Sequence, residues 1–197
     1  MQFYILSLKS SASSYASLNL VGSAQLEGAP TCPDCGTELG LSKTLPPYRY
    51  LLKGKKIGDL LTDGLDIAVS NRFCERYKQS GLTGVHFSND EIHSKNIPSG
   101  YRMAFPEVTL TKLDESASGL DIDEVYGCSR CRVVSRNRLE RIVIDEKTLE
   151  GWDMFTCGNL FGRIIVTVRF VNFIGENELT NFQSISQDEY SENFLKP

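Results

Sequence analysis

The chain has 197 residues, of which 41% are hydrophobic and 23% are charged, and its formal net charge at pH 7 is −4. A chain of this length and composition can bury a substantial core, so extended disorder is disfavoured. Its densest basic patch, Lys53, Lys55 and Lys56, is short, which disfavours nucleic-acid binding. An acidic surface instead suits a basic protein partner.

Neither a signal peptide nor a membrane span is predicted. The first nine residues lack a basic segment and a long apolar run, and the longest apolar candidate, 164–174, is interrupted by Thr167, Arg169 and Asn172. We therefore expect a cytoplasmic protein with no membrane partner. In that reducing compartment, cysteines are expected to serve metal or redox chemistry rather than structural disulfides.

The first predicted element is a strand over residues 3–8, where apolar and polar side chains alternate. The serine-rich stretch 10–17 is expected to be a solvated connection, and 18–26 a second extended segment. Residues 70–81 carry a helix signature, because Ser70 suits the N-cap and Gly81 suits the left-handed position after the helix.

The later elements are predicted in the same way. A strand over 101–105 follows a Pro-Ser-Gly turn, and the acidic segment 114–123 is expected to be a surface loop. A strand is expected over 136–144, and another ends at Val166. A helix over 167–177 then follows, because apolar residues there recur at helical spacing.

Two Cys-x-x-Cys turns carry the strongest chemical signal, and they hold Cys32 with Cys35 and Cys128 with Cys131. A two-residue spacer lets both sulfurs of a turn face one ion, so the four thiolates predict a closed tetrahedral Zn²⁺ site. Iron, a redox-active pair or a coincidence of buried cysteines are the alternatives. Because four cysteines leave no open coordination position, the zinc is expected to be structural.

The two halves of the chain also share a pattern. Each cysteine of the first turn lies 96 residues before its counterpart in the second, and the segment 59–64 matches 153–158 with a small change of offset. We interpret this as a diverged internal repeat, spanning about 27–112 and 123–197. The sequence therefore predicts one α+β domain over residues 1–197, an internally duplicated mixed sheet and helix architecture with one zinc knuckle in each half and a shared metal site.

Several polar residues have a structural interpretation. Asp59 and Asp153 occupy matched positions in the repeats and are expected to be turn or cap residues. Arg72 and Arg169, also matched, are expected to pair or pack within each repeat. The acidic run 121–124 lacks the spacing of a calcium loop and is expected to be a solvated turn.

No catalytic constellation is recognisable in the sequence. The only two histidines, His86 and His93, leave few possible members for a histidine-dependent site, and glycine-rich phosphate loops are absent. Cys74 and Cys157 are expected to be small buried apolar residues. The protein is therefore expected not to be an enzyme.

The chain resembles the double-CxxCG motif family, first noted as myxobacterial paralogues, in which an imperfect motif occurs once in each half. Arg132 stands where the family pattern has glycine, which predicts an altered geometry in the second half-site. The resemblance spans nearly the whole chain and rests on Cys32 to Gly36, Leu45-Pro46-Pro47, Gly58-Asp59, Val69-Ser70, Gly81 to Gly84, and the second cysteine turn with Trp152 to Phe155.

The resemblance implies an immunity protein that binds and neutralises a cognate polymorphic toxin, as in the swarming-inhibition toxin immunity proteins. The residues alone leave a second class open, which is a zinc-ribbon interaction module or a metal-dependent enzyme with an unrecognised site. If the toxin is a nuclease, acidic residues could complement its basic cleft. The candidates for that surface lie in the C-terminal stretch: Glu176, Glu178, Asp188, Glu189, Tyr190 and Glu192.

Overall fold

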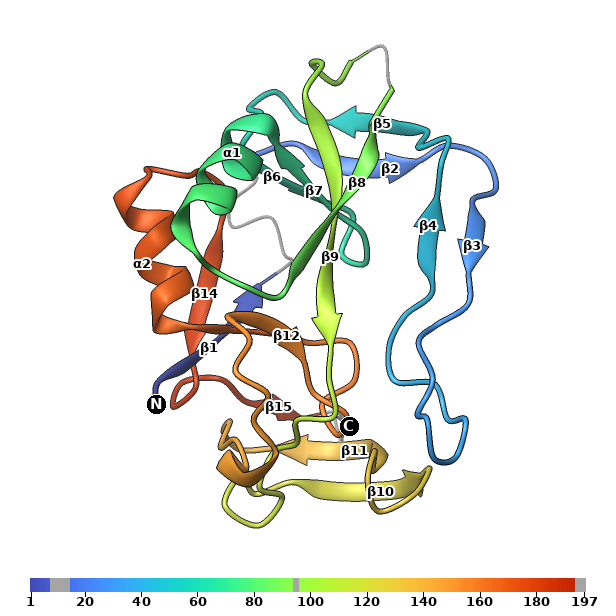
Figure 1. The fold of residues 1–197 in the computed structure, drawn as a ribbon, viewed down its shortest axis with the longest axis vertical. Coiled ribbons are helices and arrows are strands. Elements are labelled where there is room, and N and C mark those ends of the chain that lie inside the picture. The colour runs from blue at the N-terminus through green and yellow to red at the C-terminus, as the bar shows by residue number, and fades with distance from the viewer. Residues whose placement is uncertain (8–14, 94–95, 194–197) are drawn as a thin grey trace.

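A mixed sheet with two helices beside it forms the centre of the fold (Figure 1). The computed structural model describes residues 1–7, 15–93 and 96–193. Within these residues the sheet has eight strands in the order β14-β1-β13-β12-β9-β7-β6, with β8 paired to β9. The pairing of β9 with β12 is parallel and the others are antiparallel. The strands are β1 (Phe3–Ser7), β6 (Leu60–Thr62), β7 (Ile67–Ser70), β8 (Val85–Glu91), β9 (Tyr101–Val108), β12 (Met154–Thr156), β13 (Ile164–Thr167) and β14 (Gln183–Ser186). The predicted α+β class is confirmed.

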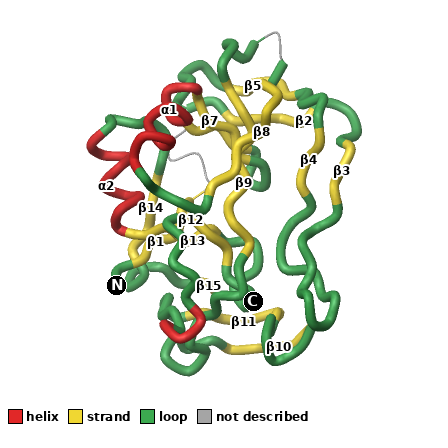
Figure 2. The backbone as a smooth tube through the Cα atoms, in the orientation of Figure 1, coloured by secondary structure: helices red, strands yellow, loops and turns green. Residues whose placement is uncertain are grey.

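Smaller sheets surround this centre, and Figure 2 shows two ribbons, one across the top of the view and one along its right side. One ribbon pairs β2 (Ser17–Leu20) with β5 (Tyr50–Lys53), and the other pairs β3 (Gln25–Glu27) with β4 (Lys43–Leu45). A three-stranded sheet has the order β10-β11-β15. Its strands are β10 (Asp121–Tyr126), β11 (Val133–Leu139) and β15 (Glu192–Asn193), and a short 3-10 helix spans Glu146–Thr148.

Both predicted helices are confirmed, and each follows a β-hairpin. Helix α1 (Asn71–Ser80) follows β6 and β7, and α2 (Val168–Glu176) follows β12 and β13. The Ser70 hydroxyl accepts a hydrogen bond from the Phe73 N–H at 3.1 Å, and the Thr167 hydroxyl accepts one from the Phe170 N–H at 3.4 Å. These side chains satisfy N–H groups that a helix start leaves without a partner. At the end of α1, Gly81 takes the left-handed conformation with φ of 70°.

An aromatic cluster joins the two helices to each other and to the sheet. The Phe73 ring of α1 stacks on Phe182 with centroids 5.2 Å apart, and it meets Phe173 of α2 edge-on at 5.7 Å. Tyr77 and Phe170 complete the contact and are also buried. Full burial of one such side chain contributes roughly 1.5–3 kcal/mol. The helices are therefore held on the sheet mainly by these rings.

Strand β13 crosses the centre of the sheet, and both of its faces are covered. Ile164 and Val166 pack into the aromatic cluster on the helix side, whereas Ile165 packs against Phe3 and Phe155 on the other side. A strand covered on both faces has an uninterrupted apolar sequence. This explains why periodicity alone did not reveal where β13 ends, and why the cap at Thr167 was the better signal.

The structure corrects two predictions in the third quarter of the chain. Residues 121–124, predicted as a solvated turn at the end of a loop, belong to strand β10. The acidic side chains have low strand propensity and a register shift between Ile122 and Glu124 interrupts the alternation, so the sequence hides this strand. Its partner β11 spans Val133–Leu139 rather than the predicted 136–144, because pairing with β10 sets its start.

The other strand predictions are confirmed with adjusted limits. The strand predicted over 3–8 spans Phe3–Ser7, and the one predicted over 101–105 spans Tyr101–Val108. The extended segment predicted over 18–26 divides into β2 and β3. Most of the predicted connection 10–17 lies outside the described residues. Neither helix that the structure describes has the length and apolar character needed to span a bilayer.

Candidate metal centre

The four cysteines predicted as metal ligands lie together. Their sulfur atoms are all within 4.8 Å of one another. The Sγ–Sγ distance is 3.8 Å from Cys32 to Cys128, 3.6 Å from Cys35 to Cys131, and 3.9 Å from Cys128 to Cys131. A tetrahedral ion with metal–sulfur bonds of about 2.3 Å separates its sulfur ligands by about 3.8 Å. The four cysteines could therefore bind a metal ion.

The first knuckle, residues 32–36, is a tight turn in the loop between β3 and β4. The Cys32 N–H donates to the Thr37 carbonyl at 2.8 Å, and the Gly36 N–H donates to the Cys32 carbonyl at 2.9 Å. Gly36 has a φ of 74°, in the left-handed region that favours glycine. The closed turn brings Cys35 back beside Cys32 and directs both sulfurs to the cluster.

The second knuckle, residues 128–132, forms the end of the β10–β11 hairpin. The Arg132 N–H donates to the Cys128 carbonyl at 2.8 Å, and Arg132 has a φ of 43°. Its guanidinium group also makes two hydrogen bonds to the Glu115 carboxylate, at 2.6 and 2.8 Å. Arg132 thus adopts the left-handed conformation of Gly36 and closes its turn with the corresponding bond. In these features the knuckles agree, contrary to the altered geometry predicted from the loss of glycine.

An ion pair joins the two knuckles, and a glycine beside the second knuckle leaves room for the sulfur cluster. Asp34 and Arg130 occupy the same position in their knuckles, and the Arg130 guanidinium donates to the Asp34 carboxylate at 2.8 Å. Gly127 lies against the cluster, where an added Cβ would be 2.5 Å from the Cys131 sulfur and 3.0 Å from the Thr37 hydroxyl. A side chain at position 127 would therefore displace a predicted ligand.

The metal centre is buried on one side and open on the other. Cys131 is fully buried and Cys32 is 2% exposed, whereas Cys35 is exposed. Hydrogen bonds between Cys35 and Thr37 lower the pKa of Cys35 to about 6. Burial, followed by contacts with the neighbouring thiols, raises the pKa of Cys131 to about 11. A bound cation favours the thiolate form at every ligand, so it would offset the cost of ionising Cys131.

The remaining two cysteines do not join the cluster. Cys74 lies on α1 in the aromatic cluster, and Cys157 is fully buried beside Phe155 and Leu160. Burial raises the pKa of Cys74 to about 11 and raises the pKa of Cys157 further. Thiols with such values stay protonated and unreactive near neutral pH. The prediction that both are small buried apolar residues is confirmed.

The buried carboxylate of Asp59 accepts hydrogen bonds from several elements, so Asp59 is not the turn or cap residue that the sequence suggested. Its carboxylate accepts hydrogen bonds from the Ser70 hydroxyl at 2.7 Å and from the Arg72 guanidinium at 2.7 and 3.1 Å. It also accepts two from Thr180, through the backbone N–H and the hydroxyl, both at 2.9 Å. Burial by itself raises the pKa of Asp59, but the bonds from Arg72, Thr180 and Ser70 outweigh it and lower the pKa to about 2.

Asp153 makes the corresponding contacts at the matched position. Its carboxylate accepts from the Thr167 hydroxyl at 2.7 Å, from Arg169 at 3.2 Å, and from the Thr83 N–H at 3.1 Å. Arg72 and Arg169 therefore pair with the aspartate of their own predicted repeat, as expected. Thr180 and Thr83, however, each reach the aspartate of the other repeat. The matched Leu-Thr pairs at 82–83 and 179–180 were the available signal for these contacts.

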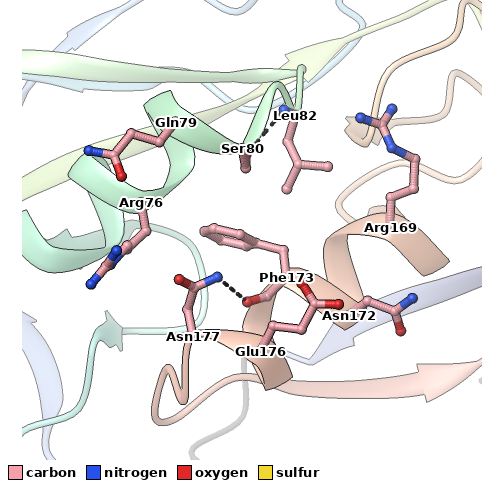
Figure 3. A pocket seen from close by; sticks show the side chains of 9 residues that line it. All are labelled: Arg76, Gln79, Ser80, Leu82, Arg169, Asn172, Phe173, Glu176 and Asn177. Atoms are coloured by element: carbon pink, nitrogen blue, oxygen red, sulfur yellow. Dashed lines mark hydrogen bonds between the residues drawn. The ribbon is translucent and has the colours of Figure 1, made fainter.

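A cleft of about 410 Å³ is lined by residues of both helices and of the segments that follow them (Figure 3). Figure 3 shows Phe173 between the helices, while Arg76 and Arg169 extend in different directions. The lining contains no cysteine, histidine or aspartate, and its only carboxylate is Glu176. His86 lies elsewhere, on β8, where its ring is 2.6 Å from the Glu107 carboxylate. The cleft thus lacks a set of nucleophilic and acid–base groups that converge on one point.

The acidic C-terminal stretch is only partly available for a partner. The Glu192 side chain is 7% exposed and pairs with Arg136 and Arg163, each at 2.6 Å. The Tyr190 hydroxyl bonds to Glu192 and accepts from Arg163. These two residues are therefore bound within the protein, whereas Asp188 and Glu189 are exposed.

The comparisons with known proteins leave the ancestry of the chain open. No protein-family model matches this chain, and no curated protein matches it. The resemblance to the double-CxxCG motif family therefore stays a prediction.

Proposed function

We propose that the protein is a non-enzymatic binding protein, stabilised by a structural zinc ion, that neutralises a cognate toxin as an immunity protein. The observation that most supports a structural role is the closed set of four sulfurs. Four cysteine ligands fill a tetrahedral coordination sphere, so neither a substrate nor an activated water can reach the ion.

The position of the metal centre supports the same proposal. The knuckles come from different halves of the chain, and Cys32, Leu39, Cys131 and Val133 form a buried cluster of their own. An ion at this site would link the β3–β4 ribbon to the β10–β11 hairpin, neither of which belongs to the eight-stranded sheet. We infer that the ion holds peripheral elements in place, which suits a protein that acts through its surface.

The matched contacts of Asp59 and Asp153 support the predicted internal repeat. Each aspartate lies before a hairpin, binds the cap residue and the arginine of the following helix, and accepts from a threonine of the other segment. We infer that the hairpin–helix units are diverged copies of one element. This interpretation accounts for one knuckle in each half.

An unrecognised metal-dependent enzyme is the weaker alternative. The lining of the cleft between the helices contains Glu176 but no cysteine, histidine or aspartate, so it does not offer the three protein ligands of a catalytic zinc site. A zinc-ribbon interaction module would share the same metal centre and would differ only in its partner.

The first test is elemental analysis of the untagged, purified protein, for which we expect one zinc per chain and no iron.

The second test places the chain under inducible control in cells that also express the product of the gene adjacent to its own. We expect restored growth and a stoichiometric complex of the two chains on size exclusion. Growth arrest that persists despite abundant folded protein would contradict the immunity role.

A further inference from the structure

Strand β10 is the free edge of the three-stranded sheet (Figure 1). One side of β10 pairs with β11, and within the described residues no strand pairs with the other side. Every residue of β10 except Ile122 is exposed. A free edge presents backbone N–H and C=O groups that can bind a further strand. The edge is therefore a surface on which an extended segment can dock.

Apolar groups lie at the end of this edge nearest to the metal centre. Val125 is 45% exposed and Tyr126 is 44% exposed, and they are the last two residues of β10. An open hollow of about 460 Å³ lies beside Tyr126, and Val133 and Phe161 also line it. Its lining includes Arg136 and Arg163, which pair with Glu192. Partly exposed aromatic side chains beside a hollow are typical anchors of a protein interface. An added strand could place a side chain in this hollow.

The charge of β10 indicates what kind of strand it accepts. Asp121, Asp123 and Glu124 are exposed, and no ion pair to any of them is found within the described residues. Asp123 accepts a hydrogen bond from the Ser135 hydroxyl, and Glu124 accepts one from the Tyr126 hydroxyl. Like charges repel a second copy of the same edge, whereas a basic strand is attracted.

We propose that β10 binds a basic, extended segment of a partner protein, which adds to the sheet as a further strand and places an apolar side chain beside Tyr126. This inference deepens the proposed function and rests on it for the nature of the partner. It assigns the docking surface to β10 instead of the C-terminal stretch. Because the second knuckle joins β10 to β11, the metal centre also fixes the docking edge.

The strand addition is tested on the full, metal-loaded chain with a short capped peptide in which arginine and valine alternate. We expect this peptide to bind and to slow hydrogen exchange of the backbone amides of β10. The same peptide with glutamate in place of arginine is the control and should not bind. Binding of the basic peptide without protection of β10 amides would contradict strand addition.

Variants locate the binding surface on the protein itself. The double variant Asp123→Lys with Glu124→Lys should weaken binding of the arginine peptide by at least about tenfold, because it reverses the charge of the edge. The matched control is Glu75→Lys with Asp90→Lys, which changes the net charge equally but lies on exposed positions of α1 and β8. Thermal melts verify that both variants fold. Equal affinity of the two variants for the arginine peptide would contradict the proposal.

A growth-rescue assay separates failure of this inference from failure of the proposed function. If the wild-type chain restores growth and Asp123→Lys with Glu124→Lys does so equally well, then the immunity role stands and the β10 assignment is wrong. If the wild-type chain gives no rescue but the peptide still binds and protects β10, then the edge is a docking site for another partner and the immunity role is wrong. Loss of rescue only in the β10 variant supports both.

Discussion

The two predicted repeats meet at two sites that differ in what they require. At the candidate metal centre, Cys32 and Cys35 lie within 4.8 Å of Cys128 and Cys131, and the proposed zinc ion would be the group that satisfies all four sulfurs. At the aspartate sites, Asp59 and Asp153 are satisfied by hydroxyl, amide and guanidinium groups of the protein alone. The comparison suggests that the eight-stranded sheet can persist without metal, whereas the elements around the knuckles cannot.

The largest effect is expected from loss of a buried ligand. Cys131→Ser should release the metal and lower the free energy of unfolding by about 4 kcal/mol or more, because loss of a metal is among the most destabilising changes. Chemical denaturation and elemental analysis provide the measurement, and Cys74→Ser is a control for a buried cysteine outside the centre. Full stability in Cys131→Ser would refute the structural role.

Removal of the metal separates the two sites directly. A strong chelator should increase hydrogen exchange in both knuckles and in the β10–β11 hairpin. The amides of Leu60 and Met154 should stay protected, because they donate to the Thr180 and Thr83 carbonyls at 3.3 and 3.2 Å. Equal loss of protection throughout the chain would instead mean that the sheet also depends on the metal.

A smaller and pH-dependent effect is expected at the aspartate site. The pKa of Asp59 is about 2 in the folded chain against an ordinary value of 3.8, so its ionised form stabilises the fold above pH 3.8. Asp59→Asn should therefore cost about 2 kcal/mol at neutral pH. As pH falls through the folded value near 2, wild-type stability should approach that of the variant.

Paired denaturation curves of wild type and Asp59→Asn measure this difference, and any metal loss at low pH affects both chains. A stability difference that stays constant from neutral pH to pH 2 would show that the charge of Asp59 contributes nothing.

The smallest effect is expected at the second knuckle. Arg132→Gly loses the ion pair with Glu115 but removes the strain of a side chain at positive φ, so metal binding should be retained. Arg132→Ala loses the ion pair and keeps the strain, and should be less stable than Arg132→Gly by about 1 kcal/mol. Thermal melts of the two variants provide the comparison. A more stable alanine variant would contradict the claim that a side chain at position 132 is strained by its positive φ.

Local signals explain what the sequence could predict. The helix starts at Ser70 and Thr167 were predictable because a cap and the first turn lie within a few residues of each other. The pairs Cys32 with Cys35 and Cys128 with Cys131 were predictable because ligand spacing within each turn is a short-range property. The meeting of the two turns, 96 residues apart, was predictable only because a tetrahedral ion needs four ligands.

Long-range contacts explain what the sequence did not predict. Strand β10 exists through its pairing with β11, against the low strand propensity of Asp121 and Asp123. The Asp59 carboxylate accepts hydrogen bonds from Thr180, which lies 121 residues away. Arg132 tolerates a positive φ while its guanidinium is held by Glu115. A partner far along the chain decides each of these cases, and one sequence does not reveal such partners.

The exchange of threonines between the aspartate sites has an evolutionary consequence. Thr180 donates a hydrogen bond to Asp59, and Thr83 donates one to Asp153. The threonine of each segment therefore contacts the aspartate of the other segment. That is the pattern of an isologous interface between identical subunits. A single hairpin–helix unit would leave its aspartate short of partners and could regain them by binding a second copy of itself. If the two segments are copies of one unit, as we propose, the present chain would correspond to a homodimer whose subunits became fused.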